Sequence, residues 1–382
     1  MRKKQIAILG STGSIGTQAL DVIEAQSDLF EVYAITANNR VEELVAQARK
    51  FNPEVVVIAN KDKYSFVKES LADLPIKVFA GAEPIDAVAE MEPVDIVLTA
   101  MVGYAGLRPT ISALKASKTI ALANKETLVV AGDIVCELSR QYKSAILPVD
   151  SEHSAVFQSL AGEVSPIEKI ILTASGGPFR GKDRKFLETV TPAAALKHPN
   201  WDMGAKITID SASMMNKGFE VIEAKWLFDV RPDQIEAVVH PQSLIHSMVQ
   251  FEDGSVKAQM GLPDMKLPIQ YAFGYPTRLK NNYPRLDFYN CASMTFEKPD
   301  LEVFRNLALA YEALNKGGNM PCILNAANEV VVAAFLKEQI SFLRMSDVIE
   351  ETMQRVAFMQ KPTYEDYVAT DVEARKVAMS MI

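Results

Sequence analysis

Apolar and polar positions follow two different rhythms along the first 150 residues. Short apolar runs are typical of strands, and the stretches between them place apolar residues at helical spacing. The runs are nearly continuous, which indicates strands buried on both faces of a parallel sheet. An α/β fold with a doubly wound parallel sheet is therefore expected. Its strands are expected at 5–9, 31–36, 54–58, 76–80, 95–100, 119–123 and 144–150.

The pattern changes after residue 150. Residues 169–174 and 206–210 are strand candidates, and a stretch rich in glycine and proline separates them. Residues 243–262 form two alternating runs around Asp253 and Gly254, which is the pattern of an antiparallel hairpin. We therefore expect a central α+β domain.

From about residue 300 onward strand patterns largely disappear, and helices are expected within 300–318, 321–339, 346–360 and 370–382. Gly317 and Gly318 are expected to end the first helix, and Pro321 suits the first turn of the second. Thr370 and Glu373 have the spacing of a capping box for the last helix. Residues 276–300 are rich in proline, asparagine and aromatic side chains, so they are expected to form a linker.

Composition narrows the classes of function. The chain has 382 residues and a formal net charge of −8, and this acidic balance argues against nucleic-acid binding. No apolar run approaches the roughly 20 residues that span a bilayer. The basic start runs directly into a strand candidate without a cleavage site, so no signal peptide is expected. The three cysteines, Cys136, Cys291 and Cys322, form neither a disulfide framework nor a zinc pattern, which fits the cytoplasm.

A glycine-rich turn follows the first expected strand. Gly10, Gly13 and Gly16 are spaced three residues apart, and a helix is expected directly afterwards. Glycines let the backbone approach a pyrophosphate, and the start of a helix supplies amide donors. The turn therefore predicts a dinucleotide site, although a simple tight turn is the alternative. Hydroxyl donors are added by Ser11, Thr12 and Ser14.

The end of the second expected strand indicates which dinucleotide binds. An NAD site usually has an acidic residue there for the ribose 2′-hydroxyl. This chain instead has Ala37, Asn38, Asn39 and Arg40, a set of amides and one cation that suits a 2′-phosphate. We therefore predict NADP(H), with a solvated cation at the start of a helix as the alternative interpretation of Arg40.

Carboxylates follow the last strand of the α/β domain and recur farther along. Asp150 and Glu152 are two residues apart, so a continuing strand would point both to one side. Asn216 and Glu220 share one face of an expected helix at i, i+4, with Lys217 beside them. Hard oxygen ligands suit Mg²⁺ or Mn²⁺. Taken alone, an Asp-x-Glu pair is more often a solvated loop end.

Two further loops carry polar and bulky residues. Residues 173–179 offer the hydroxyl of Ser175 and flexible glycine amides, a pattern that suits an anion nest. Residues 198–204 bring His198, Trp201 and Met203 together. They are interpreted either as hydrophobic packing or as a lid that closes over a substrate.

Six strings occur together and in order: GSTGSIG (10–16), ANKE (123–126), LPVDSEH (147–153), ASGGPFR (174–180), HPNW (198–201) and DSASMMNKGFEVIEA (210–224). Together they resemble the 1-deoxy-D-xylulose 5-phosphate reductoisomerase family of the non-mevalonate isoprenoid pathway. The resemblance extends over essentially the whole chain. It implies isomerisation and reduction of 1-deoxy-D-xylulose 5-phosphate to 2-C-methyl-D-erythritol 4-phosphate, with NADPH and a divalent metal, Mg²⁺ or Mn²⁺.

The resemblance also implies the domain organisation. Residues 1–149 would form a Rossmann-like NADPH-binding domain, and 150–275 a central catalytic and dimerisation domain with the lid loop. The linker at 276–300 would lead to a C-terminal helical bundle at 301–382. The protein would be a homodimer that acts on a small sugar phosphate, without a nucleic-acid or membrane partner.

By resemblance, each group of site residues acquires a role. The metal ligands would be Asp150, Glu152 and Glu220, and the catalytic set would add Lys125, between substrate and cofactor. Substrate contacts would come from Ser151, Ser175, His198, Trp201, Met203, Ser211, Asn216 and Lys217. Cofactor contacts would come from Gly10, Ser11, Thr12, Gly13, Ser14, Ile15, Ala37, Asn38, Asn39, Arg40, Asn124, Glu126 and Gly204. Asp202 stands in the lid where a small or polar residue is often seen.

Two other functions remain open at this point. The first is a metal-independent NADP-dependent dehydrogenase of a phosphorylated metabolite, which a chelator would not inhibit. The second is a non-catalytic NADP-binding regulator, which would show no turnover and would leave the three carboxylates without a purpose.

Overall fold

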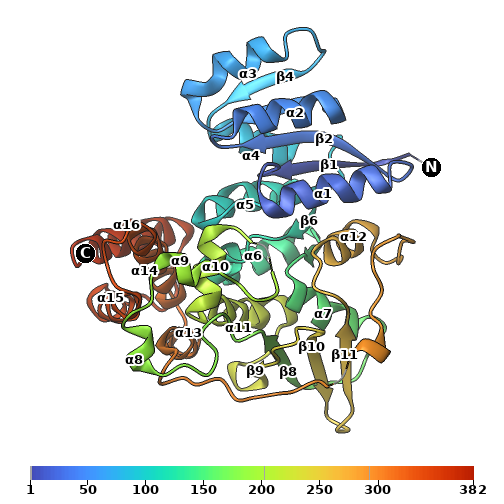
Figure 1. Cartoon of the computed structure of the whole chain (residues 1–382). Coiled ribbons are helices and arrows are strands. Elements are labelled where there is room, and N and C mark those ends of the chain that lie inside the picture. Colours follow the sequence, from blue (N-terminus) through green and yellow to red (C-terminus); the bar gives the residue numbers. More distant parts are fainter. Residues whose placement is uncertain (1, 202, 292) are drawn as a thin grey trace. The chain divides into compact units, whose positions relative to one another are not determined.

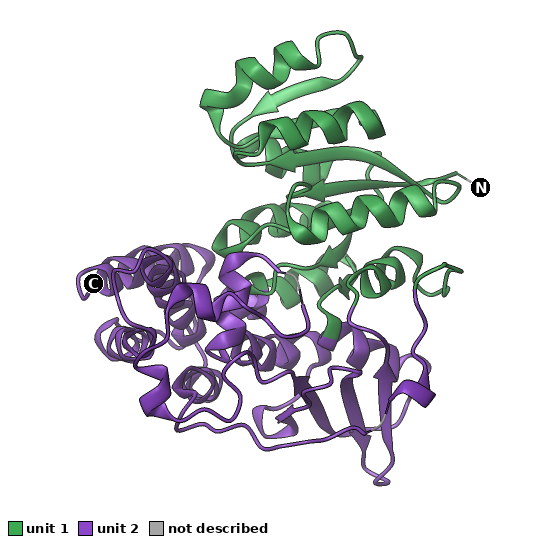
Figure 2. Ribbon diagram, in the orientation of Figure 1, with its two compact units in different colours: residues 1–127, 135–151, 264–283 green, residues 128–134, 152–263, 284–382 purple. Residues whose placement is uncertain are grey.

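The computed structural model describes residues 2–201, 203–291 and 293–382. The lid residue Asp202 lies outside these ranges. The chain divides into two compact units (Figure 2). Unit 1 comprises residues 1–127, 135–151 and 264–283, and unit 2 comprises 128–134, 152–263 and 284–382. Within the described ranges, no helix is long and apolar enough to cross a membrane.

Unit 1 is built on a seven-stranded sheet with the order β4-β3-β2-β1-β5-β6-β7 (Figure 1). All neighbouring strands run parallel. The strands are β1 Lys4–Leu9, β2 Phe30–Ala37, β3 Val55–Ile58, β4 Lys77–Ala80, β5 Ile96–Thr99, β6 Thr119–Leu122 and β7 Ile146–Pro148. The predicted doubly wound sheet and its seven strands are confirmed.

Helices pack beside these strands. They are α1 Ser14–Ala25, α2 Val41–Phe51, α3 Tyr64–Ser70, α4 Glu83–Glu90, α5 Leu107–Lys115, α6 Glu126–Tyr142 and α12 Lys266–Gly274, with short 3₁₀ turns at Lys61–Lys63 and Gly103–Gly106. The central strands are mostly apolar because both faces are covered: β3 is fully buried, and so are Ile6 to Leu9 of β1.

The strand order indicates where this sheet is expected to bind a ligand. Successive strands extend from β1 in one direction through β4, and then from β5 in the other. Open α/β sheets bind ligands at the carboxyl ends of the strands where this reversal occurs. Here the loops that follow β1 and β5 meet: a side chain on Gly10 would lie 2.8 Å from the carbonyl oxygen of Ala100.

Unit 2 contains a four-stranded sheet with the order β11-β10-β8-β9. Its strands are β8 Ile167–Ala174, β9 Ile235–Val239, β10 Ile245–Phe251 and β11 Val256–Met260. β8 and β9 are parallel, whereas β10 runs antiparallel to both β8 and β11. The expected hairpin around Asp253 and Gly254 is confirmed, and so is the α+β character of this part of the chain.

Helices make up the rest of unit 2. They are α7 Ser151–Leu160, α8 Arg184–Leu187, α9 Pro192–Ala195, α10 Ala205–Ala212, α11 Met215–Phe228, α13 Arg305–Lys316, α14 Met320–Leu336, α15 Phe342–Arg355 and α16 Tyr364–Met379, with 3₁₀ turns at Pro232–Gln234 and Phe288–Asn290. α14 is buried on nearly every side and packs against α13, α15 and α16. A helix that is apolar all round belongs in such a position.

Two local predictions are wrong. Residues 206–210 form part of α10 and not a strand, because tertiary contacts override the strand preference of their β-branched side chains. The capping box of α16 is Thr363 with Asp366, since the helix begins seven residues earlier than the Thr370 signal suggested. Pro321 does lie in the first turn of α14, as expected.

The close packing of the first glycine turn generates a stability prediction. A side chain on Gly16 would lie 2.3 Å from the carbonyl oxygen of Gly10, whereas one on Gly13 would meet that oxygen at 3.4 Å. Gly16→Ala should therefore lower the free energy of unfolding by about 1–3 kcal/mol, as overpacking does. Gly13→Ala is the matched control in the same turn and should have little effect. Urea unfolding of both variants tests this, and equal losses would contradict it.

Candidate functional site

The glycine turn of unit 1 leaves the start of α1 open. Gly10 has a φ of +94°, and its N–H donates to the carbonyl oxygen of Thr36 at 3.2 Å. Gly13 caps α1 without a side-chain hydrogen bond, so the first amides of the helix are available to an anion. Ser14 is exposed and Ile15 half-buried at the first two helical positions.

The hydroxyl of Ser11 serves the turn itself. It is buried, and its Oγ donates to Oε1 of Gln47 at 2.7 Å. Gln47 in turn donates from Nε2 to the carbonyl oxygen of Ser11 at 3.0 Å. Ser11 therefore holds the loop against α2 rather than offering its hydroxyl to solvent.

The residues after β2 lie beside this turn. Nη1 of Arg40 donates to the carbonyl oxygen of Thr12 at 2.8 Å, while 69% of its side chain stays exposed. The Oδ1 atom of Asn39 accepts from Asn60, and the carbonyl oxygen of Ala37 accepts from the main chain of residue 59. Arg40 is thus a cation at the edge of the glycine turn, with its guanidinium mostly open to solvent.

Asn124 joins two loops of unit 1. Its Nδ2 donates to the carbonyl oxygens of Met101 and Gly103 at 2.7 and 2.9 Å, and its Oδ1 accepts from the N–H of Thr127 at 3.1 Å. The loop at 100–106 follows β5 and was not selected from the sequence. This loop could have been found only from the topology, because it follows β5, the strand at which the order of strands in the sheet reverses.

The two residues after Asn124, Lys125 and Glu126, are charged and largely buried in the same part of unit 1. Nζ of Lys125 lies 2.8 Å from Oδ2 of Asp150, and both side chains are largely buried. Glu126 is buried and accepts from Nδ2 of Asn124 at 3.1 Å. The ammonium therefore neutralises Asp150 at the carboxyl end of β7.

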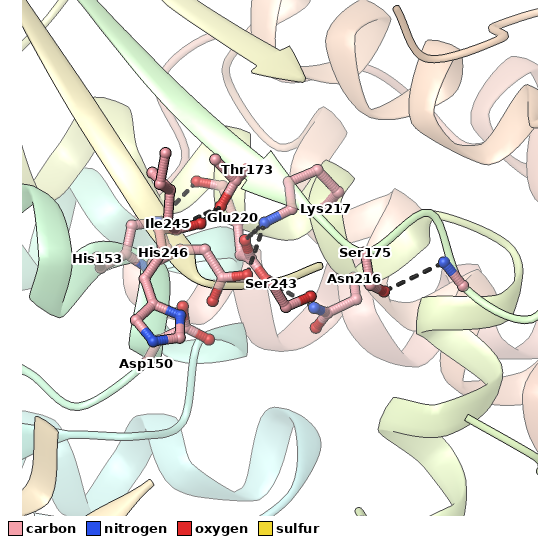
Figure 3. A network of polar contacts seen from close by, with 12 residues as sticks. Asp150, His153, Thr173, Ser175, Asn216, Lys217, Glu220, Ser243, Ile245 and His246 are labelled. Carbon is pink, nitrogen blue, oxygen red and sulfur yellow. Dashed lines mark hydrogen bonds and ion pairs between the residues drawn. The ribbon is translucent and has the colours of Figure 1, made fainter. Parts of the chain in front are cut away.

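In unit 2, two carboxylates converge on one ammonium (Figure 3). Glu152 lies in the first turn of α7 and Glu220 is fully buried on α11, and each offers an oxygen within 4.8 Å of the other. Nζ of Lys217 lies 3.1 Å from Glu152 and also pairs with Glu220. Nδ2 of Asn216 donates to Glu220 at 2.6 Å, so the expected i, i+4 pairing of these two residues on α11 is present.

Asp150 is tied to this cluster by the chain itself. β7 ends at Pro148 and α7 begins at Ser151, so the strand does not continue to Glu152 as the simplest interpretation supposed. The Cα atoms of Asp150 and Glu152 still cannot be more than about 7 Å apart, because only two peptide units separate them. Ser151 lies between them and opens α7.

A buried pair holds α7 against α11. Nδ1 of His153 lies 3.0 Å from Oε2 of Glu223, and its Nε2 lies 2.9 Å from the carbonyl oxygen of Glu220. Both side chains are essentially inaccessible. Since His153 follows Glu152 directly, and Glu223 lies one turn after Glu220, this pair fixes the two carboxylates relative to each other.

A second polar group in unit 2 forms around the loop after β8. Oγ of Ser175 lies 3.2 Å from Nε2 of His198 and accepts from the N–H of Gly177 at 3.2 Å. Gly177 has a φ of +65°, and a side chain there would lie 2.7 Å from the carbonyl oxygen of Ser211. The structure therefore places Ser175 beside His198, and the backbone of Ser211 beside the loop that carries Ser175.

His198 is hydrogen-bonded to the backbone of the segment that follows it. Its Nδ1 accepts from the N–H groups of Asn200 and Trp201 at 3.2 and 3.0 Å, which leaves the proton of the neutral ring on Nε2. Burial lowers the pKa of His198 to about 4. The Trp201 ring lies 6.3 Å from that of His246, and Gly204 caps the following helix. Met203 is half-buried.

The pKa of His198 predicts how stability depends on pH. The unfolded chain takes up this proton near pH 6.5, but the folded chain does so only near pH 4. The contribution of the neutral ring is therefore complete above pH 6.5 and is lost as the pH falls toward 4. In His198→Gln, the free energy of unfolding should fall less steeply across this interval.

Urea unfolding at several pH values, together with proton NMR of the imidazoles, measures this effect. The chain has four histidines, so the signal missing in His198→Gln identifies the residue. Titration of that signal near pH 6.5 would contradict the prediction.

Models of one family match most of the chain. The 1-deoxy-D-xylulose 5-phosphate reductoisomerase model matches residues 6–132. The model of its C-terminal domain matches residues 146–228, and the model described as the DXP reductoisomerase C-terminal domain matches residues 260–377. Matches therefore fall in both units.

Curated relatives agree with the family models. The 1-deoxy-D-xylulose 5-phosphate reductoisomerase of Bacteroides fragilis is 70% identical over 383 residues, which cover 100% of this chain and 99% of that protein. The protein of the same name from Porphyromonas gingivalis is 58% identical and covers 100% of this chain and 98% of its own length.

Solved structures show the same fold. The Zymomonas mobilis reductoisomerase in complex with NADPH superimposes with a TM-score of 0.92 at 43% identity, covering 100% of this chain and 99% of that one. A DOX-P reductoisomerase in complex with NADPH, fosmidomycin and magnesium gives 0.93 at 38% identity, over 99% and 98% of the two chains. The chain therefore belongs to the 1-deoxy-D-xylulose 5-phosphate reductoisomerase family.

Proposed function

We propose that this chain performs the reaction of its family with the residues described above. The reaction is the isomerisation and NADPH-dependent reduction of 1-deoxy-D-xylulose 5-phosphate to 2-C-methyl-D-erythritol 4-phosphate with Mg²⁺ or Mn²⁺. Relatives that carry this activity in their names are 70% and 71% identical over the full chain. The observation that carries the residue assignment is the pair of carboxylates, Glu152 and Glu220, held on one buried ammonium.

The donor set fits a divalent cation. Glu152 and Glu220 already share a cation, the ammonium of Lys217, and Asp150 follows from its place two residues before Glu152. Three carboxylates supply the hard oxygens that Mg²⁺ and Mn²⁺ prefer. Such an ion, when bound, polarises the carbonyl and hydroxyl oxygens of a substrate as a Lewis acid. Asp150, Glu152 and Glu220 would hold it.

Lys217 and Asn216 serve the substrate from the same helix. Both side chains lie against Glu220 on α11, with the ammonium of Lys217 buried. With a metal ion held by the carboxylates, Lys217 and Asn216 would donate to the oxygens of the substrate. In unit 1, Lys125 balances the charge of Asp150 in the same way.

The second polar group suits the phosphate of the substrate. Hydroxyls of Ser175 and Ser211 and the amides of the glycine loop are donors that phosphate oxygens accept. His198 adds a fixed donor, since its proton lies on Nε2 and its lowered pKa keeps the ring neutral. Binding of a phosphate remote from the reacting carbons can be used to close the lid.

Trp201 and Met203 give the lid its apolar surface. They follow His198 in the chain, so a phosphate that binds His198 also positions the two bulky side chains. Closure excludes water and retains the reacting fragments.

The glycine turn and the residues after β2 suit NADPH, which supplies the hydride. The open start of α1 takes the pyrophosphate, and Arg40 with Asn39 lies where a 2′-phosphate is recognised. The loop at 100–106 lies at the same edge of the sheet.

We infer a homodimer formed through one face of unit 2. β11 is an edge strand with an exposed start, and exposed edges are templates for pairing with another chain. Phe288, Tyr289 and Phe296 are large apolar side chains that are also exposed. Sedimentation that gives the mass of one chain would remove this inference.

We also infer a reducing compartment, the cytoplasm. Cys136, Cys291 and Cys322 all carry free thiols. Structural disulfides are rare in the cytoplasm and common outside it. Recovery of the protein from a periplasmic or extracellular fraction would contradict this.

Removal of one carboxylate tests the residue assignment. Glu152→Gln should lower kcat by about 100-fold or more, the range for losing one electrostatic contact to the transition state. The dissociation constant of NADPH should stay within about twofold, because binding of the cofactor does not depend on Glu152. Steady-state kinetics and fluorescence titration with NADPH measure the two effects.

Glu236→Gln is the matched control, because Glu236 also pairs with a lysine, at 2.6 Å, but is exposed on β9. It should retain the wild-type kcat. Equal losses of turnover and NADPH binding in Glu152→Gln, or no loss of turnover, would overturn the assignment of Glu152.

A further inference from the structure

α10 is helical against its local sequence preference. It spans only Ala205–Ala212 and contains three successive β-branched residues, Ile207, Thr208 and Ile209. Such residues favour strands, and short helices are marginal without tertiary support. Gly204 caps the helix without a side-chain hydrogen bond. The contacts that keep α10 helical must therefore come from elsewhere in unit 2.

Ile209 and Ala212 pack into the hydrophobic core, and Asp210 adds polar contacts. Its Oδ2 pairs with Nζ of Lys206 one turn earlier at 2.9 Å, and its Oδ1 accepts from Nδ2 of Asn328 on α14 at 2.8 Å. Both Asp210 and Asn328 are almost completely buried. Nζ of Lys206 also lies 4.9 Å from the ring centre of Phe219, which precedes Glu220 on α11. Asp210 thus links α10 to α14 directly and to α11 through Lys206.

The amide of Asn328 is a polar group in the largely apolar core around α14. Its Oδ1 atom is buried and has no hydrogen-bond partner among the residues that the structure describes. An unpaired amide oxygen destabilises the apolar core around α14. The bond from its Nδ2 to Asp210 is the interaction that an apolar residue could not supply.

α10 connects two parts of the proposed phosphate site, the segment that carries His198 and the residue Ser211. The lid ends at Gly204, where α10 begins, and Ser211 follows Asp210 directly. The carbonyl oxygen of Ser211 packs against Gly177 of the loop that carries Ser175. A change in α10 would therefore move Ser211 and the end of the lid together.

We propose that Asp210 is a positioning residue for the phosphate of the substrate. Its buried bond to Asn328 and its ion pair with Lys206 keep α10 helical, which holds Ser211 beside Ser175 and anchors the lid. This proposal rests on the proposed function, which assigns the phosphate to Ser175, Ser211 and His198.

A charge-swap cycle tests the proposal. Asp210→Asn places amide hydrogens toward Lys206 or Asn328, and Asn328→Asp places two carboxylates together. In the double variant the amide at position 210 can donate to the carboxylate at position 328, which restores the hydrogen bond in the opposite direction. Asp371→Asn is the matched control, because Asp371 is a buried aspartate on α16 that pairs with Arg375 at i+4, at 2.7 Å.

Each single variant should raise the KM for 1-deoxy-D-xylulose 5-phosphate and the inhibition constant of inorganic phosphate by about tenfold, the effect of losing one buried contact. The KM for NADPH should stay unchanged. The double variant should return both constants part of the way to wild type, because it restores the hydrogen bond between positions 210 and 328 but not the ion pair with Lys206. Amide hydrogen exchange of residues 205–212 should accelerate in the single variants and recover in the double variant.

Four outcomes would overturn the proposal: unchanged phosphate constants in the single variants, equal changes in Asp371→Asn, absence of recovery in the double variant, or unchanged hydrogen exchange at 205–212. The exchange measurement needs no activity. Wild-type protein without turnover would therefore contradict the proposed function alone, whereas unchanged exchange at 205–212 would contradict the role of Asp210.

Discussion

The arrangement of the site depends on two like charges held together in the interior of unit 2. Glu152 and Glu220 come from different helices, and their repulsion in a buried position would separate α7 from α11 without a counter-charge. Lys217 supplies that charge, and Asn216 takes a remaining carboxylate oxygen of Glu220. The His153–Glu223 pair also holds α7 against α11. His153 lies one residue after Glu152, and Glu223 lies one turn after Glu220.

The same constraint connects chemistry with packing. The proposed metal site would need little rearrangement on binding an ion, since Glu152 and Glu220 are already held close together by two packed helices. The residues that we propose for the phosphate, in contrast, lie on loops and on a short helix rich in β-branched residues. The proposed site would thus combine a rigid group of carboxylates with a region whose order depends on a few buried polar contacts. The proposed closure of a lid requires the second kind of region.

Much of the fold follows from the sequence because its strongest signal is hydrophobic pattern. The seven strands of unit 1 follow largely apolar runs, and each forms. The pattern fails at 206–210, where the decisive contact, Asp210 with Asn328, joins residues 118 positions apart. It also misses the loop at 100–106, because that loop is defined by strand order rather than by residue type. Local spacing did identify Asn216 and Glu220, since i, i+4 geometry is a property of one helix.

The central claim is that one chain couples a metal-assisted rearrangement to reduction by NADPH. The most direct test follows NADPH absorbance after addition of 1-deoxy-D-xylulose 5-phosphate, with Mg²⁺ or Mn²⁺ and then with excess chelator, and identifies the product by mass and NMR. The account predicts oxidation that stops with the chelator, returns with added metal and yields 2-C-methyl-D-erythritol 4-phosphate. Oxidation that persists in excess chelator, or a product with an unrearranged carbon skeleton, would contradict it.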